Sequence, residues 1–81
     1  MSKVFIVEDD EIIANMVAEH LKSWKMEVRC ANGLKNVTEE IKEFSPDIVL
    51  MDINLPYYNG FYWCAEIRKF SKIPIVFLSS A

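Results

Sequence analysis

The sequence contains few of the residues that would build a disulfide scaffold or a nitrogen- and sulfur-ligated metal site. It has two cysteines, Cys30 and Cys64, and one histidine, His20, in 81 residues. The cysteines lie far apart and form no C-x-x-C pair, so we expect them to act as small apolar side chains in a reducing compartment. A single histidine excludes a metal site built from a histidine cluster.

The chain also lacks long apolar runs and basic clusters. No apolar stretch is long enough to cross a bilayer, and the N-terminus shows no signal-peptide pattern, so a cytoplasmic protein without a membrane partner is predicted. The formal net charge of -3 argues against nucleic-acid binding by this segment itself. A hydrophobic content of 52% and a charged content of 26% suit one small folded domain, residues 1–81.

Apolar residues alternate between strand-like and helix-like spacing along the chain. Short apolar runs at 3–7, 26–31, 47–53 and 74–78 predict strands. Between these runs, helical spacing predicts inward-facing residues at Ile12, Ile13, Met16, Val17, Leu21 and Trp24, then at Leu34, Val37, Ile41 and Phe44, then at Phe61, Cys64, Ile67 and Phe70. The order β-α-β-α-β-α-β predicts a doubly wound α/β fold with a parallel sheet covered on both faces.

Local signals mark several ends of these elements and several loop residues. Asp9 or Asp10 is expected to cap the first helix, and Ser45-Pro46 to end the second. Tyr57 and Tyr58 are interpreted as exposed loop residues, and the alternatives are that they gate the site or contact a kinase. In the run at 61–64 we expect mostly core residues and one exposed aromatic side chain, which would leave a partner surface. The methionines at 16, 26 and 51 are expected to fill the core.

Acids and a hydroxyl follow three of the predicted strands. Glu8 and Asp9 follow the first strand, Asp52 ends the third, and Ser79 follows the fourth. Because ligands of such sheets bind beyond the carboxyl ends of the strands, we expect these groups to meet at one edge. A buried Asp52 is costly unless it is paired or bound to a cation. Crowded carboxylates without histidine or cysteine ligands favour Mg²⁺, or Mn²⁺, over zinc.

A carboxylate beside Mg²⁺ can attack a phosphoryl group and form an acyl phosphate. Asp52 is the candidate nucleophile, and Ser79 is placed to bond a phosphate oxygen. An alternative is a Mg²⁺-dependent phosphohydrolase with an aspartyl nucleophile. Those enzymes carry D-x-D at the end of the first strand, whereas this chain has E-D-D there and D-x-N at the third. The non-catalytic alternative for Asp52 is a structural acid that caps a loop.

Three segments together resemble the receiver domain of bacterial two-component response regulators. They are VEDD at 7–10, MDINLP at 51–56 with a glycine four residues later, and PIVFLSS at 74–80. The resemblance covers the whole chain. VEDD and the run FYWC at 61–64 resemble the corresponding segments of the OmpR-type transcription regulators. Within that group, they are similar to the branch that responds to antimicrobial peptides and cell-envelope stress. The resemblance implies a flavodoxin-like fold with strand order 2-1-3-4, and a conformational switch phosphorylated by a sensor histidine kinase.

The resemblance also implies a role for each matching residue. Glu8 and Asp9 match the acidic pair that binds the metal, and Asp52 matches the phosphoacceptor beside it. Asn54 matches the position whose backbone carbonyl completes the metal site. Ser79 matches the switch hydroxyl.

Other positions depart from the family pattern. Asn59 stands where an aspartate is frequent, which is expected to affect only a helix cap, and Ala81 matches a variable position beside the site. The sequence ends after the fourth predicted strand, without the family's fifth strand and its lysine, the last helices and the DNA-binding output domain. DNA contact is therefore expected only through such an output domain. Because the fourth strand would then lie at the edge of the sheet, the sequence predicts a homodimer or a segment-swapped dimer. A non-signalling dimerisation module is an alternative function.

Overall fold

The computed structural model describes residues 2–78, which form one parallel sheet with helices on both faces. The elements are β1 (Lys3–Val7), α1 (Glu11–Ser23), β2 (Glu27–Cys30), α2 (Val37–Phe44), β3 (Ile48–Asp52), α3 (Gly60–Arg68) and β4 (Ile75–Leu78). The strand order is β2-β1-β3-β4, and each neighbouring pair is parallel. The predicted doubly wound α/β fold and its strand order are confirmed.

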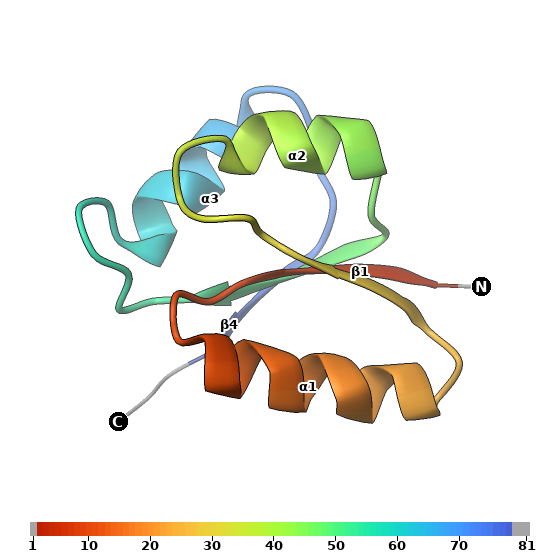
Figure 1. The fold of residues 1–81 in the computed structure, drawn as a ribbon. Coiled ribbons are helices and arrows are strands. Elements are labelled where there is room, and N and C mark those ends of the chain that lie inside the picture. The colour runs from red at the N-terminus through yellow and green to blue at the C-terminus, as the bar shows by residue number, and fades with distance from the viewer. Residues whose placement is uncertain (1, 79–81) are drawn as a thin grey trace.

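One face of the sheet carries α2 and α3, and the other carries α1 (Figure 1). Phe5, Val7, Val49 and Met51 point from the two central strands toward α2 and α3, and none of them is exposed to solvent. Ile67 of α3 is also fully buried in this cluster. Residues that alternate along a strand face opposite sides of the sheet, so this cluster uses every second position of β1 and β3.

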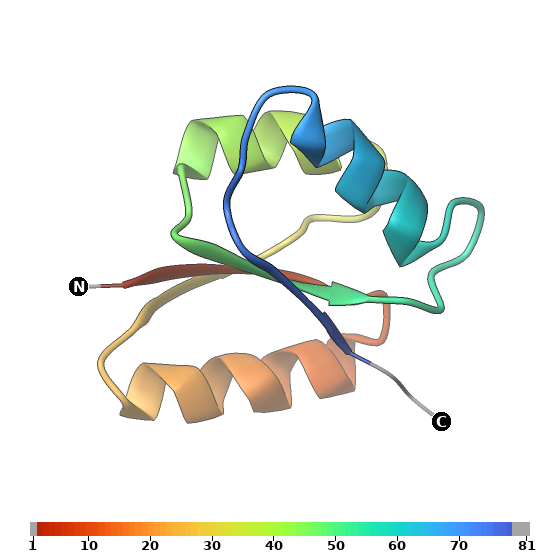
Figure 2. The same ribbon diagram turned by 180° about the vertical axis from the view of Figure 1, so that it is seen from behind.

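The opposite face is covered less completely. Val4 and Ile6 of β1 are buried there beneath α1, which packs on β1 and β2. Ile48 and Leu50 of β3 join this cluster but stay partly exposed. Seen from behind, β4 forms the near edge of the sheet while α1 lies at the far side (Figure 2). Within residues 2–78, the β3 side of this face is therefore only partly covered.

The predicted inner face of α1 is wrong for its largest residues. Ile12, Met16 and Trp24 are exposed by 74%, 67% and 69%. The face of α1 that packs on the sheet is instead formed by two alanines and two larger apolar residues, namely Ala14, Val17, Ala18 and Leu21. The two alanines set the contact because they bring the helix close to the strands. Apolar residues therefore occur on more than one side of α1, and spacing alone selected the wrong side.

The predicted inner face of α3 is also wrong in part. Trp63 and Ile67 are buried, whereas Phe61 and Phe70 are exposed by 58% and 39%. The Phe61 ring packs instead on Phe77 of β4, with ring centroids 4.9 Å apart. Trp63 and Ile67 lie four residues apart in the helix that begins at Gly60, so they share the face that points to the core.

Helix ends follow the expected local chemistry. Asp10, rather than Asp9, caps α1, because its side chain accepts hydrogen bonds from the backbone N–H groups of Ile12 and Ile13 at 3.0 and 3.3 Å. Ser45 ends α2 with a left-handed backbone, φ +52°. Asn59 caps α3 by accepting a hydrogen bond from its first turn at 3.0 Å, as its position predicted.

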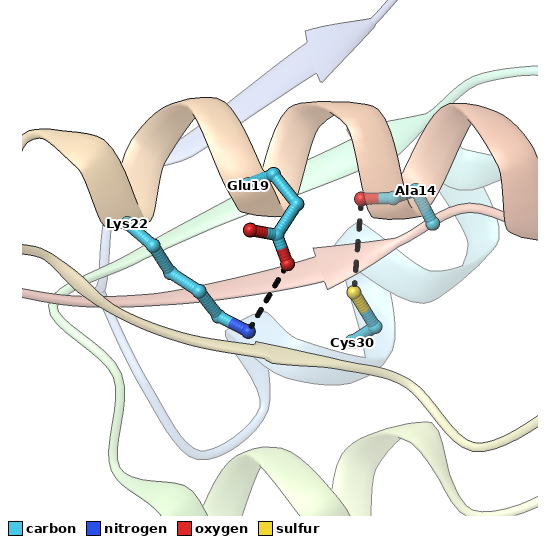
Figure 3. A network of polar contacts seen from close by, with 4 residues as sticks. All are labelled: Ala14, Glu19, Lys22 and Cys30. Atoms are coloured by element: carbon cyan, nitrogen blue, oxygen red, sulfur yellow. Dashed lines mark hydrogen bonds and ion pairs between the residues drawn. The ribbon is translucent and has the colours of Figure 1, made fainter.

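Both cysteines carry free thiols and are half-buried. The Cys30 thiol lies 3.9 Å from the carbonyl oxygen of Ala14, joining β2 to α1 (Figure 3). Burial raises the pKa of this thiol, which keeps it protonated. The Lys22 and Glu19 ion pair beside it spans 4.0 Å on an exposed helix surface and contributes little to stability. In residues 2–78, no helix combines the length and apolarity needed to cross a membrane.

Candidate functional site

Three carboxylates meet where β1 and β3 end. Glu8 and Asp9 follow β1 directly, and Asp52 is the last residue of β3. The pairing of Val7 with Met51 sets these ends side by side. Oxygen atoms of Glu8, Asp9 and Asp52 all lie within 4.8 Å of one another. The structure therefore brings together the three carboxylates that the sequence placed in one site.

The three carboxylates differ in burial. Asp52 is 5% exposed and is the buried charged residue among residues 2–78, whereas Glu8 is half-buried and Asp9 is exposed. The backbone N–H of Asn54 donates a hydrogen bond to Asp52 Oδ1 at 3.0 Å. Such a bond stabilises an ionised carboxylate and fixes its orientation. Asp52 is thus a buried, oriented acid with a more exposed pair of acids beside it.

Burial, together with the neighbouring carboxylate of Asp52, raises the pKa of Glu8. Burial first, and then hydrogen bonding and charge repulsion from Asp52, raise the pKa of Glu8 to about 7. A hydrogen bond from the backbone N–H of Asp10 to Glu8 Oε2, at 3.4 Å, lowers the pKa and so acts in the opposite direction. The site therefore holds more negative charge than its own residues neutralise. A cluster of carboxylate oxygens with unbalanced charge fits a hard divalent cation such as Mg²⁺.

Gly60 supports the site through its lack of a side chain. A Cβ atom at Gly60 would lie 2.4 Å from the backbone oxygen of Asp52 and 3.1 Å from Ile53 Cα. The Gly60 N–H donates to the Ile53 carbonyl at 3.1 Å, so α3 begins directly against the end of β3. Sequence reasoning noted this glycine only as part of a motif. The close backbone approach that requires it becomes visible only in the fold.

The loop between β3 and α3 contains a strained turn. The Tyr58 N–H donates to the Pro56 carbonyl at 2.8 Å, which closes a three-residue turn around Tyr57. Tyr57 has φ +68°, a conformation that is rare for a bulky residue. Leu55 is 8% exposed and anchors the loop in the core. The residues after Asp52 are therefore held in a defined path.

For some residues near the predicted site, the structure gives only part of the information or none. Ser79 and Ala81 lie outside the described residues. Asn54 lies at the site through its N–H bond to Asp52, and the role of its carbonyl stays a prediction. Asp10 caps α1 and is not among the clustered acids.

The strand order and the acidic edge define a flavodoxin-like receiver fold, and solved receiver structures have the same fold. The N-terminal domain of the lantibiotic response regulator NsrR, a nisin resistance regulator, is 48% identical with a TM-score of 0.92, over 100% of this chain and 68% of that one. The BeF3-activated receiver domain of RstA from Klebsiella pneumoniae is 34% identical with a TM-score of 0.90, over 98% and 68%.

Residues 4–81 match the family profile of the response regulator receiver domain, and the chain belongs to this family. The transcriptional regulatory protein YvcP of Bacillus subtilis is 46% identical over 80 residues, which is 99% of this chain and 34% of that protein. The sensory transduction protein BceR of Halalkalibacterium halodurans is 40% identical over 80 residues, 99% of this chain and 35% of that protein. The chain spans about a third of the length of these relatives. The predicted family is confirmed.

Proposed function

We propose that Asp52 accepts a phosphoryl group from the phosphohistidine of a sensor histidine kinase, and that the domain acts as a conformational switch. The observation that carries this proposal is the buried Asp52 carboxylate within 4.8 Å of the acids Glu8 and Asp9, at the carboxyl edge of a receiver sheet. The protein acts as a phosphoacceptor rather than as an enzyme with turnover. At most it catalyses its own phosphorylation and dephosphorylation.

The transfer uses a carboxylate oxygen of Asp52 as the nucleophile. That oxygen forms a bond to phosphorus while the bond from phosphorus to the donor nitrogen breaks, and the leaving imidazole takes up a proton. The Asn54 N–H holds Oδ1 of Asp52 at 3.0 Å and so orients the carboxylate. Ser79 would supply the hydroxyl that bonds a phosphate oxygen afterwards.

Glu8, Asp9 and Asp52 are the residues that would hold Mg²⁺, or Mn²⁺, with the Asn54 backbone carbonyl as a further ligand. Their oxygen-only donor set and the raised pKa of Glu8 support this assignment. When bound, the cation offsets negative charge on the group being transferred. Glu8 and Asp9 otherwise repel an incoming phosphoryl group.

Phosphorylation with a small phosphodonor and Mg²⁺ tests the proposal. We expect intact-mass spectra to show one added phosphoryl group on wild type and none on Asp52→Asn. Asp47→Asn is a matched control, because Asp47 precedes β3 at its opposite end. Removal of Mg²⁺ by a chelator should abolish the modification in wild type. Equal labelling of Asp52→Asn and wild type would overturn the assignment, and sustained turnover of a phosphate ester would favour a phosphohydrolase.

We also propose that, in a longer protein, the phosphoryl group on Asp52 controls DNA binding and transcription through a separate output domain. Support comes from YvcP, which is a transcriptional regulatory protein, and from NsrR, which is a lantibiotic response regulator. A stimulus from antimicrobial peptides or envelope stress would match the latter. Induction of a reporter by such peptides, lost in Asp52→Asn, is the expected result.

The outer edge of β4 supports a further proposal, self-association. In the described residues β4 pairs with β3 on one side, and Val76 of β4 is 45% exposed. An apolar edge of this kind can pair with a second chain. We expect sedimentation of the 81-residue chain to show a concentration-dependent dimer, and a monomer at every concentration would exclude it.

A further inference from the structure

A cavity of about 710 Å³ lies between two loops at the carboxyl end of the sheet. One wall is residues 32–36, between β2 and α2, and the other is residues 56–58 with the first turn of α3. Both loops project from the same end of the sheet (Figure 1). None of the three clustered acids lines the cavity, so it is separate from the phosphoacceptor site. Its volume falls in the range of roughly 300–1,000 Å³ that is typical of small-molecule sites.

The wall of the cavity is aromatic and internally packed. Tyr58 and Tyr62 stack with ring centroids 4.2 Å apart and planes inclined by 19°. Trp63 meets both rings edge-on, at 6.1 and 5.1 Å. Tyr57, fixed by the strained turn, is 94% exposed at the rim. Rings held by one another present flat surfaces on which a planar ligand can stack without ordering them first.

The same wall contains a buried donor that has no acceptor. Trp63 is 8% exposed, and its indole Nε1 has no hydrogen-bond partner in residues 2–78. Buried N–H groups are almost always paired in folded proteins, so a lone one needs an explanation. A ligand with an acceptor oxygen would supply the missing partner. This favours a ligand that has both a ring and an oxygen acceptor.

The charge of the cavity determines whether an anionic or a cationic ligand is favoured. Lys35 is the charged side chain among the described lining residues, and Asn32 and Asn36 add amide groups. Glu40 does not line the cavity. Its carboxylate oxygens Oε1 and Oε2 accept hydrogen bonds from the backbone N–H of Asn32 at 3.1 and 3.3 Å. That contact fixes the loop that carries Lys35. The cavity is therefore basic and aromatic, which complements an aromatic anion.

We propose that this cavity binds a small planar aromatic carboxylate, with its ring against Tyr58 and its carboxylate oxygens toward Lys35 and the indole N–H of Trp63. The ring is recognised by stacking, and the carboxylate by the single lysine and by donors of the cavity. All the lining residues come from a single chain, and ligand binding in the cavity requires neither a metal ion nor a phosphoryl group. It is thus a candidate ligand site independent of phosphorylation.

The two tryptophans of the chain provide a direct test and its internal control. Trp63 lines the cavity, whereas Trp24 ends α1 elsewhere and is 69% exposed. Titration of the ¹⁵N-labelled chain with 2-naphthoate should shift the Trp63 indole N–H signal to saturation and leave that of Trp24 in place. We expect a Kd below about 1 mM. The neutral 2-naphthylmethanol and the non-aromatic cyclohexanecarboxylate should each bind more weakly by about fivefold.

Matched lysine variants complete the test. Lys35→Gln should weaken 2-naphthoate binding by roughly three- to fivefold and leave 2-naphthylmethanol unaffected. Lys72→Gln, an exposed lysine outside the cavity, should change neither. The proposal is overturned if both indole signals shift together, if all three probes bind equally, or if Lys35→Gln binds 2-naphthoate like Lys72→Gln. Dispersed amide signals in the same spectra establish that each variant is folded.

Discussion

The two faces of the sheet are built differently. On the side of α2 and α3, the inward residues of the central strands, such as Phe5 and Val49, are fully buried. On the side of α1, Leu50 is only partly buried, and Val76 at the edge is 45% exposed. The single helix α1 packs on β1 and β2 through Ala14, Val17, Ala18 and Leu21, and within residues 2–78 the β3 side is only partly covered. We refer to the two as the closed face and the open face.

The difference in burial between the two faces indicates where the stability of the fold is concentrated. Burial of apolar surface drives folding, so the closed face carries most of the stability. Gly60, at the start of α3, rests on the backbone of Asp52, so the closed face also supports the acidic site. The open face contributes less and presents apolar surface to solvent.

The largest effect is expected from Gly60→Ala, which attacks the junction between the closed face and the site. The new Cβ would lie 2.4 Å from the Asp52 carbonyl oxygen, a contact with backbone that cannot move aside. We expect a loss of more than about 3 kcal/mol in the free energy of unfolding, measured with urea. Gly33→Ala is the control, because no atom lies within 4 Å and only its φ of +75° is unfavourable. That control should lose about 1 kcal/mol, and equal losses would contradict the steric explanation.

The next largest effect on the free energy of unfolding is expected at β3, where two adjacent residues point to opposite faces of the sheet. Met51→Ala removes a fully buried side chain from the closed face and should cost about 2–3 kcal/mol. Leu50→Ala removes a partly exposed side chain from the open face and should cost about 1–2 kcal/mol. Urea unfolding of both variants measures the difference. If Leu50→Ala is the more destabilising variant, the two faces do not differ as described.

Sequence alone predicted the elements that have strong local signals. The strand Lys3–Val7 was expected with the bounds it has, and β3 differs from its predicted range by one residue at each end. The acidic site followed because the ends of parallel strands meet at one edge, which requires no knowledge of side-chain packing. Asp52 and Glu8 were therefore placed together correctly before their distances were known.

What sequence could not give is which side of a helix faces the sheet when several sides are apolar. Ala14 and Ala18 define the contact of α1, yet larger residues gave the stronger periodic signal. The aromatic cavity was hidden for a different reason. It is lined by Lys35 and Trp63, which are distant in the chain, and by Tyr57, whose φ is +68°. Such features follow from tertiary contacts rather than from local propensity.

A smaller effect is expected from pH, through Glu8 at the end of β1. Its pKa rises from 4.5 to about 7 in the folded protein, so the folded state keeps a proton that the unfolded state has released between these values. Stability without metal should therefore fall as pH rises across this window. The expected loss is on the order of 1 kcal/mol, because Glu8 is partly solvated. Urea unfolding at a series of pH values measures it.

Two comparisons sharpen the pH prediction. Glu8→Gln should show a flatter dependence across the same window, and an unchanged slope would assign the effect to another group. Added Mg²⁺ should stabilise wild type more as pH rises, because the cation and the proton compete for the same carboxylate. A Mg²⁺ effect that is equal at both ends of the window would contradict this competition.

The smallest effect is expected on the outward side of α1, where sequence predicted a core residue. Met16 is 67% exposed, so Met16→Gln removes little buried surface and keeps a residue of good helix propensity. The free energy of unfolding of the 81-residue chain should change by less than about 0.5 kcal/mol. Ala18→Gln on the opposite side of the same helix is the informative contrast, because Ala18 is 5% exposed against the sheet. That variant should be clearly destabilised by overpacking. If Met16→Gln were as damaging as Ala18→Gln, the exposed side of α1 would be covered in solution, most simply by a second copy of the chain, and its effect would then depend on protein concentration.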